Sequence, residues 1–244
     1  MKANPDKYQA IIFGNKADNP STLTIRGIDV SCQENVKLLG IYIDSTLSFQ
    51  KQLRVVCKKA SNQINAVMRL CNVLETNVKQ DIYRSFIKSN FNYCPIIWIV
   101  SNIKNLTKLE KIQYRALKFV FNDFQNSYED LLVKSKNLSV SVYIMHCIVT
   151  EVFKCLNELA PVYLQDMFVR HQTRYVTRND DKLLQRRFKT EKYGYYSFSY
   201  LGAKLWNRMP PHIKNAVNLY DFKNQLKSWD DCSCLYKVDT TQIV

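Results

Sequence analysis

One stretch of the sequence, residues 36–49, separates two kinds of pattern. Apolar and β-branched residues fill it up to Asp44, which is typical of a strand. Serine and threonine side chains follow before Phe49, and they offer the oxygens that often cap a helix. Strand patterns precede this stretch and helix patterns follow it. We therefore expect a mainly α (α+β) fold, in which a small N-terminal antiparallel β element is followed by a helical bundle and an irregular helical C-terminal region.

Three strands are predicted on the N-terminal side. They cover Tyr8–Phe13, Leu23–Ile28 and Val36–Ile43, with glycine, asparagine and proline between the first two. These runs predict a three-stranded sheet with one open edge.

Amphipathic helices are predicted after the junction. Apolar residues recur every three or four positions from Lys51 to Leu74 and from about Lys104 to Phe121. Between them, Thr76 is expected to cap a further helix that ends near Trp98. Since a repeat of this kind buries one face of each helix, we expect these helices to share a core.

The charge of the chain favours a polyanionic partner. Its formal net charge is +14, from 35 basic and 21 acidic residues. Up to Asn122 there are 18 basic and 8 acidic residues, and the remainder has 17 and 13. The excess therefore belongs mainly to the predicted helices, as expected for a protein that binds nucleic acid.

Two basic stripes lie at helical spacing. The cations are Lys51, Arg54 and Lys58 on the first helix, and Lys104, Lys108, Lys111, Arg115 and Lys118 on the later one. Cations in a row repel one another unless a polyanion is nearby, so one interpretation is contact with backbone phosphates. An ordinary solvated face is the other interpretation.

Several short motifs follow one another along the chain. They are Asn4-Pro5-Asp6-Lys7, Ala10 to Phe13, Leu39 to Asp44, Tyr93-Cys94-Pro95 with Trp98, Phe198-Ser199-Tyr200, and Leu205 to Pro210. In this order they resemble the end of the palm, the thumb and the connector of reverse transcriptases from non-LTR (LINE-like, jockey-like) retrotransposons. That family copies RNA into DNA.

The resemblance implies roles for particular residues. Those implied to support the primer end are Leu39, Gly40 and Ile41. Lys7 is implied to lie near nucleotide phosphates, and the helix from Lys104 to Lys118 to follow the duplex backbone. The family often has a histidine shortly after the primer-supporting strand, whereas this chain has glutamine and lysine at residues 50–52.

Polymerase chemistry needs two aspartates on neighbouring strands to hold divalent metals. Adjacent aspartates occur here only as Asp180-Asp181, in a basic polar stretch, and as Asp230-Asp231 near the predicted end of the last helix. We therefore expect a truncated, non-catalytic remnant of the polymerase with no metal or cofactor. Primer extension with Mg²⁺ or Mn²⁺ is expected to give no template-dependent product, and incorporation that is abolished by D180N with D181N would contradict this expectation.

The C-terminal half has a weaker pattern. Ser127 with Asp130 predicts a helix start, and residues 138–159 predict a buried helix that includes His146 and ends before Pro161. A basic linker is predicted over 170–192. A strand over Tyr195–Tyr200 and a helix over Leu201–Met209 are predicted after it. Asn218 is expected to cap a last helix, with Asp221 in its first turn. Cys232 and Cys234 lack the second ligand pair of a zinc site.

These patterns divide the chain into segments. They are residual palm strands (1–45), a thumb-like helical domain (46–122), a helical connector (123–168), a basic linker (169–194) and a small C-terminal α/β segment (195–244). Eight irregularly spaced cysteines and the absence of a signal-peptide pattern predict an intracellular protein, cytoplasmic or nuclear, with no membrane span.

The expected partners are RNA or DNA, bound through backbone phosphates without sequence preference, and the polymerase palm. Two alternatives stay open. One is a helical protein-interaction module, which predicts a large exposed apolar patch. The other is a relic reading frame without a selected function.

Overall fold

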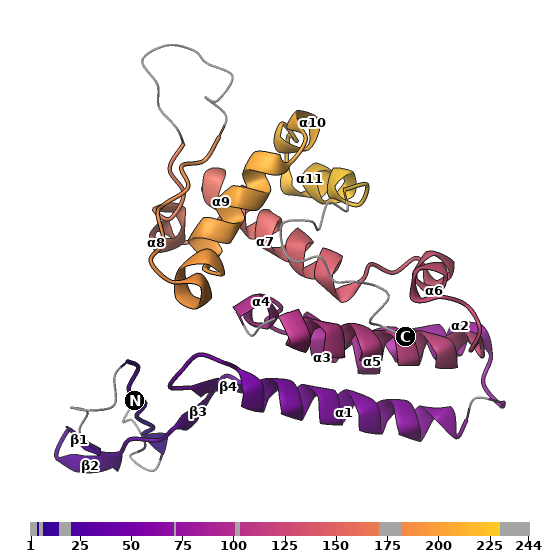
Figure 1. Cartoon of the computed structure of the whole chain (residues 1–244), viewed down its shortest axis with the longest axis horizontal. Helices are drawn as coiled ribbons and strands as arrows, with labels where there is room; N and C mark the ends of the chain where they lie inside the picture. Colours follow the sequence, from indigo (N-terminus) through magenta and orange to yellow (C-terminus); the bar gives the residue numbers. More distant parts are fainter. Residues whose placement is uncertain are drawn as a thin grey trace.

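The computed structural model describes residues 4, 7–14, 21–70, 72–100, 103–170 and 182–229. Two small hairpins come first and helices make up most of the rest, which confirms the predicted fold class (Figure 1). The strands are β1 (Thr22–Ile25), β2 (Ile28–Ser31), β3 (Asn35–Leu38) and β4 (Ile41–Asp44). The helices are α1 (Gln50–Met68), α2 (Thr76–Ile82), η3 (Tyr83–Lys88), α3 (Ser89–Asn92), α4 (Ile97–Val100), α5 (Ile103–Phe121), α6 (Tyr128–Ser135), α7 (Val140–Leu156), α8 (Val162–Gln165), η4 (Glu191–Tyr195), α9 (Phe198–Arg208), α10 (Pro211–Lys214) and α11 (Leu219–Leu226).

The N-terminal strands form two separate antiparallel hairpins, β1 with β2 and β3 with β4. The predicted three-stranded sheet is therefore wrong. Within the predicted strand Tyr8–Phe13, Ala10 makes only an isolated parallel bridge to Cys32.

The predicted single strand Val36–Ile43 is also wrong, because the chain reverses at Leu39 and Gly40. Both residues have positive φ, 47° and 86° respectively. Positive φ at both central positions is the geometry of a two-residue hairpin turn whose twist matches that of the flanking strands. Leucine adopts this conformation at a cost, and the Tyr93 hydroxyl donates a hydrogen bond to the Leu39 carbonyl oxygen. The apolar pattern alone does not show this reversal.

Three helical segments form the middle of the molecule. The chain runs out along α1, returns through α2, η3 and α3, and runs out again along α5, so that α1 and α5 point in the same direction (Figure 1). The predicted helix over 51–74 ends earlier, at Met68, and Glu75 rather than Thr76 takes the N-cap position of α2. Fully buried side chains of these segments include Leu53, Ala60, Ile64, Tyr83, Ile87, Leu109 and Leu117.

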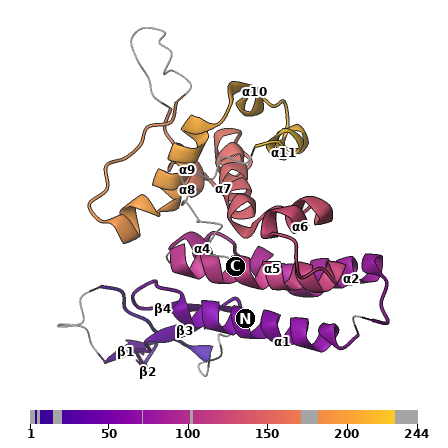
Figure 2. The same cartoon turned by 45° about the vertical axis from the view of Figure 1, so that its right-hand side comes forward.

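A second group of helices surrounds α7 on the far side of α5 (Figure 2). The Phe153 ring of α7 stacks on Phe222 of α11 with centroids 4.3 Å apart. His146 is 9% exposed, and its Nε2 lies 2.8 Å from the Trp229 carbonyl oxygen, which confirms the prediction of a packed core histidine. The cap formed by Asn218 is confirmed as well, since its side chain accepts from the Asp221 amide at 2.9 Å.

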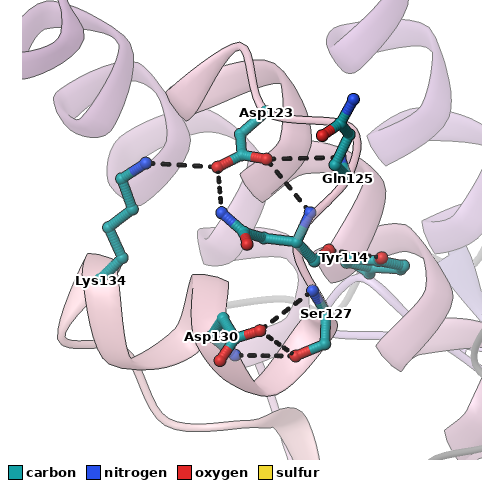
Figure 3. A network of polar contacts seen from close by, with 7 residues as sticks. Tyr114, Asp123, Gln125, Ser127, Asp130 and Lys134 are labelled. Carbon is teal, nitrogen blue, oxygen red and sulfur yellow. Dashed lines mark hydrogen bonds and ion pairs between the residues drawn. The ribbon is translucent and has the colours of Figure 1, made fainter.

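The turn between α5 and α6 is held by two carboxylates (Figure 3). Ser127 and Asp130 form the predicted capping box. Asp123 accepts from the Asn126 amide at 3.2 Å and lies 3.3 Å from the Lys134 ammonium. The hydrogen bond from the Asn126 amide is the main cause that lowers the pKa of Asp123. Tyr114 closes the turn by donating to the Asn126 carbonyl oxygen at 2.9 Å.

The C-terminal region differs from the prediction in several elements: α8, η4 and α10 were not predicted, and η4 lies partly in the predicted basic linker. Residues 195–200 belong to η4, a turn and the start of α9, so the predicted strand is wrong. The Ser197 hydroxyl caps α9, which begins at Phe198, before the predicted start at Leu201, and ends at Arg208, one residue before the predicted end at Met209. The aspartate pairs at 180–181 and 230–231 and the cysteines at 232 and 234 lie outside the described residues.

The segment boundaries stay predictions, but one apolar core runs from Ile41 to Trp229 through several of these segments.

None of the described helices is by itself long and apolar enough to cross a membrane. The pair α6 and α7 is long and apolar enough when taken together, but the two helices are bent by 55° relative to each other.

Candidate nucleic-acid interface

The two predicted basic stripes lie next to each other, because α1 and α5 pack side by side. The Arg115 guanidinium on α5 donates a hydrogen bond to the Asn65 side chain on α1. Burial raises the pKa of the Cys57 thiol on α1, and the positive charge of Lys108 partly opposes this rise. Lys108 and Arg115 therefore both lie beside α1. We call the exposed surface of these two helices the α1–α5 face.

Most of the predicted cations are exposed on this face. They are Lys51, Arg54, Lys58, Lys108, Lys111 and Arg115, joined by Lys59, which was not among the predicted residues. Lys118 is half-buried, and its ammonium lies 4.0 Å from the centroid of the Tyr114 ring. Lys104 belongs to α5 by its backbone, and its side chain lies outside the described part of the chain.

Glu110 is the only acidic residue in the sequences of α1 and α5, and it does not reach the α1–α5 face. Its side chain is 1% exposed. It accepts hydrogen bonds from the Ser141 amide at 2.9 Å, from the Ser141 hydroxyl at 2.6 Å, and from the Tyr128 hydroxyl. The positive charges of this face therefore have no carboxylate partner from their own two helices.

The position of Glu110 follows from the start of α7. The first amides of a helix have no partner within the helix and carry partial positive charge. Ser139 satisfies the Val142 amide, and Glu110 satisfies the amide of Ser141. Gln113 continues this buried network, because its amide nitrogen lies 2.9 Å from the Tyr83 hydroxyl and its oxygen 2.6 Å from that of Tyr128. Burial, followed by the charge of Glu110, raises the pKa of Tyr128.

The start of α1 is organised by Asp44. Its carboxylate accepts hydrogen bonds from the amides of Thr46 (3.1 Å), Ser48 (2.9 Å) and Phe49 (2.6 Å), and from the hydroxyls of Thr46 and Ser48. Asp44 thus holds the loop that precedes α1, while the Ser48 hydroxyl oxygen accepts from the Gln50 amide at 3.4 Å; Phe49 takes the N-cap position, without a side-chain cap hydrogen bond. A groove of about 420 Å³ opens beside this loop, and both Lys51 and Arg54 line it.

Tyr42 extends the same region onto the second hairpin. Its ring centroid lies 4.7 Å from the Lys51 ammonium and 5.5 Å from that of Lys37, its partner across the hairpin. Each ammonium is attracted to the ring by a cation–π interaction, so Lys37 and Lys51 both lie close to Tyr42. The sequence analysis missed Lys37 and Tyr42, and recognition of the turn at residues 39 and 40 would have revealed this cross-strand pair.

The remaining predicted residues have other environments. Leu39 and Gly40 form the hairpin turn, and Leu39 is 83% exposed. Ile41 begins β4 and is buried. These three residues do not form the single extended strand that the resemblance implied. Lys7 is exposed in a short turn before both hairpins.

Asparagine at position 44 is expected to destabilise the protein by about 1 kcal/mol at pH 7, because an amide replaces one of the two oxygens that receive these hydrogen bonds. Burial alone would raise the pKa of Asp44, but the hydrogen bonds from Thr46, Ser48 and Phe49 outweigh it and lower the pKa. This stabilisation is present above the unfolded-state pKa of about 3.9 and is lost as the pH falls through the lower folded-state pKa. Urea unfolding at pH 7 and in steps below pH 4 measures both effects.

The difference in stability between wild type and D44N should therefore shrink below pH 4. Asp81 is exposed on α2, so D81N is the matched control and should change little. A difference between wild type and D44N that stays constant with pH would contradict this assignment.

Comparison with known protein families, with characterised proteins and with solved structures finds no match for this chain. Among the described residues, no group of three or more histidine, cysteine or acidic side chains is arranged to hold a metal ion.

Proposed function

We propose that this chain binds a nucleic-acid duplex through its backbone phosphates on the α1–α5 face. The main observation is the separation of charge within these two helices: seven described cations are exposed, and the single carboxylate is buried at the start of α7. Cations that have no carboxylate partner on their own helices favour a polyanion, because each phosphate contact releases condensed counterions.

The same geometry supports binding without sequence preference. Lysine side chains dominate the face, and flexible ammonium groups act as point charges toward phosphate. Base reading needs bidentate arginine, asparagine or glutamine side chains placed in a groove of the duplex. On this face, the Arg115 side chain is already hydrogen-bonded to that of Asn65. RNA and DNA duplexes are therefore both candidate ligands.

The resemblance to non-LTR reverse transcriptases supports the same proposal. In that family the thumb helices follow the duplex, and here the α1–α5 face takes this role. The proposal assigns no polymerase step to this chain, and it includes an intracellular location and the family's palm as a further partner.

A protein-interaction module is the second candidate. The hairpins and the segment before them expose large apolar side chains, with Phe13 at 51%, Leu38 at 58% and Leu39 at 83% exposed. Exposed apolar side chains that gather in one region are typical of protein contacts. This candidate does not predict binding that depends on salt.

A salt titration tests the proposal. If about four phosphates are neutralised, log K for a blunt duplex should fall with log salt at a slope of about −3.6. Fluorescence anisotropy at several salt concentrations, with duplexes of unrelated sequence, measures both the slope and the sequence preference. Binding that does not change with salt would refute phosphate contact, and strong preference for one sequence would refute sequence-indifferent binding.

A further inference from the structure

A second surface, at residues 182–204, combines basic and aromatic side chains. In sequence this stretch has six basic residues against one acidic residue, and it has six aromatic residues. Its first part, up to residue 194, belongs to the predicted basic linker. The structure instead orders it into an extended segment, η4 and the start of α9.

The aromatic rings form one connected cluster. The Phe188 ring centroid lies 4.8 Å from that of Tyr200 and 5.6 Å from that of Tyr195. Tyr196 lies 5.0 Å from Tyr195 by the same measure. Because Gly194 has no side chain, Phe188 packs directly against its backbone. We call these four residues, together with Tyr193, the aromatic surface.

Parts of this cluster face solvent, and the Lys204 ammonium lies 4.5 Å from the centroid of the Tyr195 ring. Phe188 is 43% exposed and Tyr193 is 52% exposed. The exposed side chains of Arg186, Arg187 and Lys189 lie next to Phe188 in sequence. Exposed rings beside cations are the arrangement that binds unpaired nucleotides, since bases stack on the rings and the cations hold the phosphates.

The aromatic surface is continuous with the α1–α5 face. The Tyr193 hydroxyl donates a hydrogen bond of 2.9 Å to the Thr46 carbonyl oxygen, across 147 positions of sequence. Thr46 lines the groove at the start of α1 together with Lys51 and Arg54. A strand that leaves the α1–α5 face at this end therefore reaches the aromatic surface directly.

We infer that the aromatic surface binds the single-stranded extension of a duplex whose paired part lies on the α1–α5 face. The inference rests on the proposed function for the paired part and adds a separate site for the unpaired part. Stacking is tolerant of sequence because every base has an aromatic face. The preferred ligand is therefore a junction between duplex and single strand, with no fixed base sequence.

Three labelled ligands test the inference by anisotropy at one salt concentration. They are a blunt duplex, the same duplex with a single-stranded extension of about ten nucleotides, a length within the range of single-strand sites, and the same duplex with an abasic extension of equal length. The abasic ligand has the phosphates of the extension but no bases. Stacking of even one base should make the extended duplex bind about tenfold more tightly than the abasic one.

Variants of the chain assign this gain to the rings. F188L with Y193L removes two ring faces but keeps apolar side chains, so it should bind the extended and abasic ligands equally while retaining blunt-duplex affinity. The matched control Y193F keeps the ring and loses the hydroxyl that donates to Thr46, so it should retain the gain. Circular dichroism shows whether each variant folds.

A measurement on the wild-type protein keeps the test independent of these variants. 2-Aminopurine placed in the extension should lose fluorescence on binding, because stacking on tyrosine or phenylalanine quenches it. Equal affinity for extended and abasic ligands, or unquenched 2-aminopurine, with blunt-duplex binding intact, would overturn the inference and leave the proposed function in place. Absence of binding to all three ligands would refute the proposed function itself.

Discussion

Reversal of Lys108 and Arg115 to glutamate is expected to reduce the salt slope of duplex binding from about −3.6 to about −1.8, since each lost phosphate contact removes about 0.9 from the slope. At a salt concentration of about 0.1 M, this change lowers affinity on the order of 50-fold, before any repulsion from the new carboxylates. The effect should be large because both side chains belong to the α1–α5 face and lie beside α1, Arg115 next to Asn65 and Lys108 near Cys57. Anisotropy titrations of wild type and variant over the same salt series measure it.

The matched control reverses two exposed lysines, Lys223 of α11 and Lys227, the C-cap residue of that helix. This pair changes the net charge by the same amount, but α11 packs on α7, in the other group of helices (Figure 1). The control should keep a slope near that of wild type. If both double variants lose affinity equally, only the net charge matters, and the α1–α5 face returns to the interpretation as an ordinary solvated surface.

Alanine at position 110 is expected to destabilise the fold by about 3 kcal/mol or more, because buried donors lose their acceptor. The Ser141 amide and hydroxyl would both lose a partner in a region that water does not reach. Glutamine at position 110 should lower the stability less, by about 1 kcal/mol, since its side-chain oxygen can still accept from Ser141. The Tyr128 hydroxyl keeps Gln113 as an acceptor in both variants.

Urea unfolding of wild type, E110A and E110Q measures this order of stability. Glu129 is exposed on α6, so E129A is the surface control and should change stability by less than about 0.5 kcal/mol. A double-mutant cycle with S141A isolates the contact of the Ser141 hydroxyl: in the S141A background E110A should cost less than in wild type, and the cost that remains includes the loss of the acceptor of the residue-141 amide. An E110A variant as stable as E129A would show that Glu110 does not hold the start of α7.

The sequence by itself determined the helical part of this protein. The apolar repeats predicted α1, α5 and α7 as helices, with α1 ending six residues before its predicted bound, because burial of one face of a helix imposes its period on the sequence. The caps at Ser127 and Asn218 could also be predicted, since each involves residues only three positions apart. The basic stripes on α1 and α5 followed from the same spacing.

The tertiary structure decided what depends on contacts between distant residues. An apolar run such as 36–43 has the same pattern in one strand as in two paired strands, and only positive φ at Leu39 and Gly40 separates the two. Residues 195–200 alternate like a strand, yet they pack as a turn and a helix around Phe188. The period of α5 shows that Glu110 lies off the cationic stripe, but only the placement of α7 makes it a buried cap. The joining of two basic stripes into one face likewise depended on α1 packing beside α5, because the spacing within one helix carries no information about its neighbour.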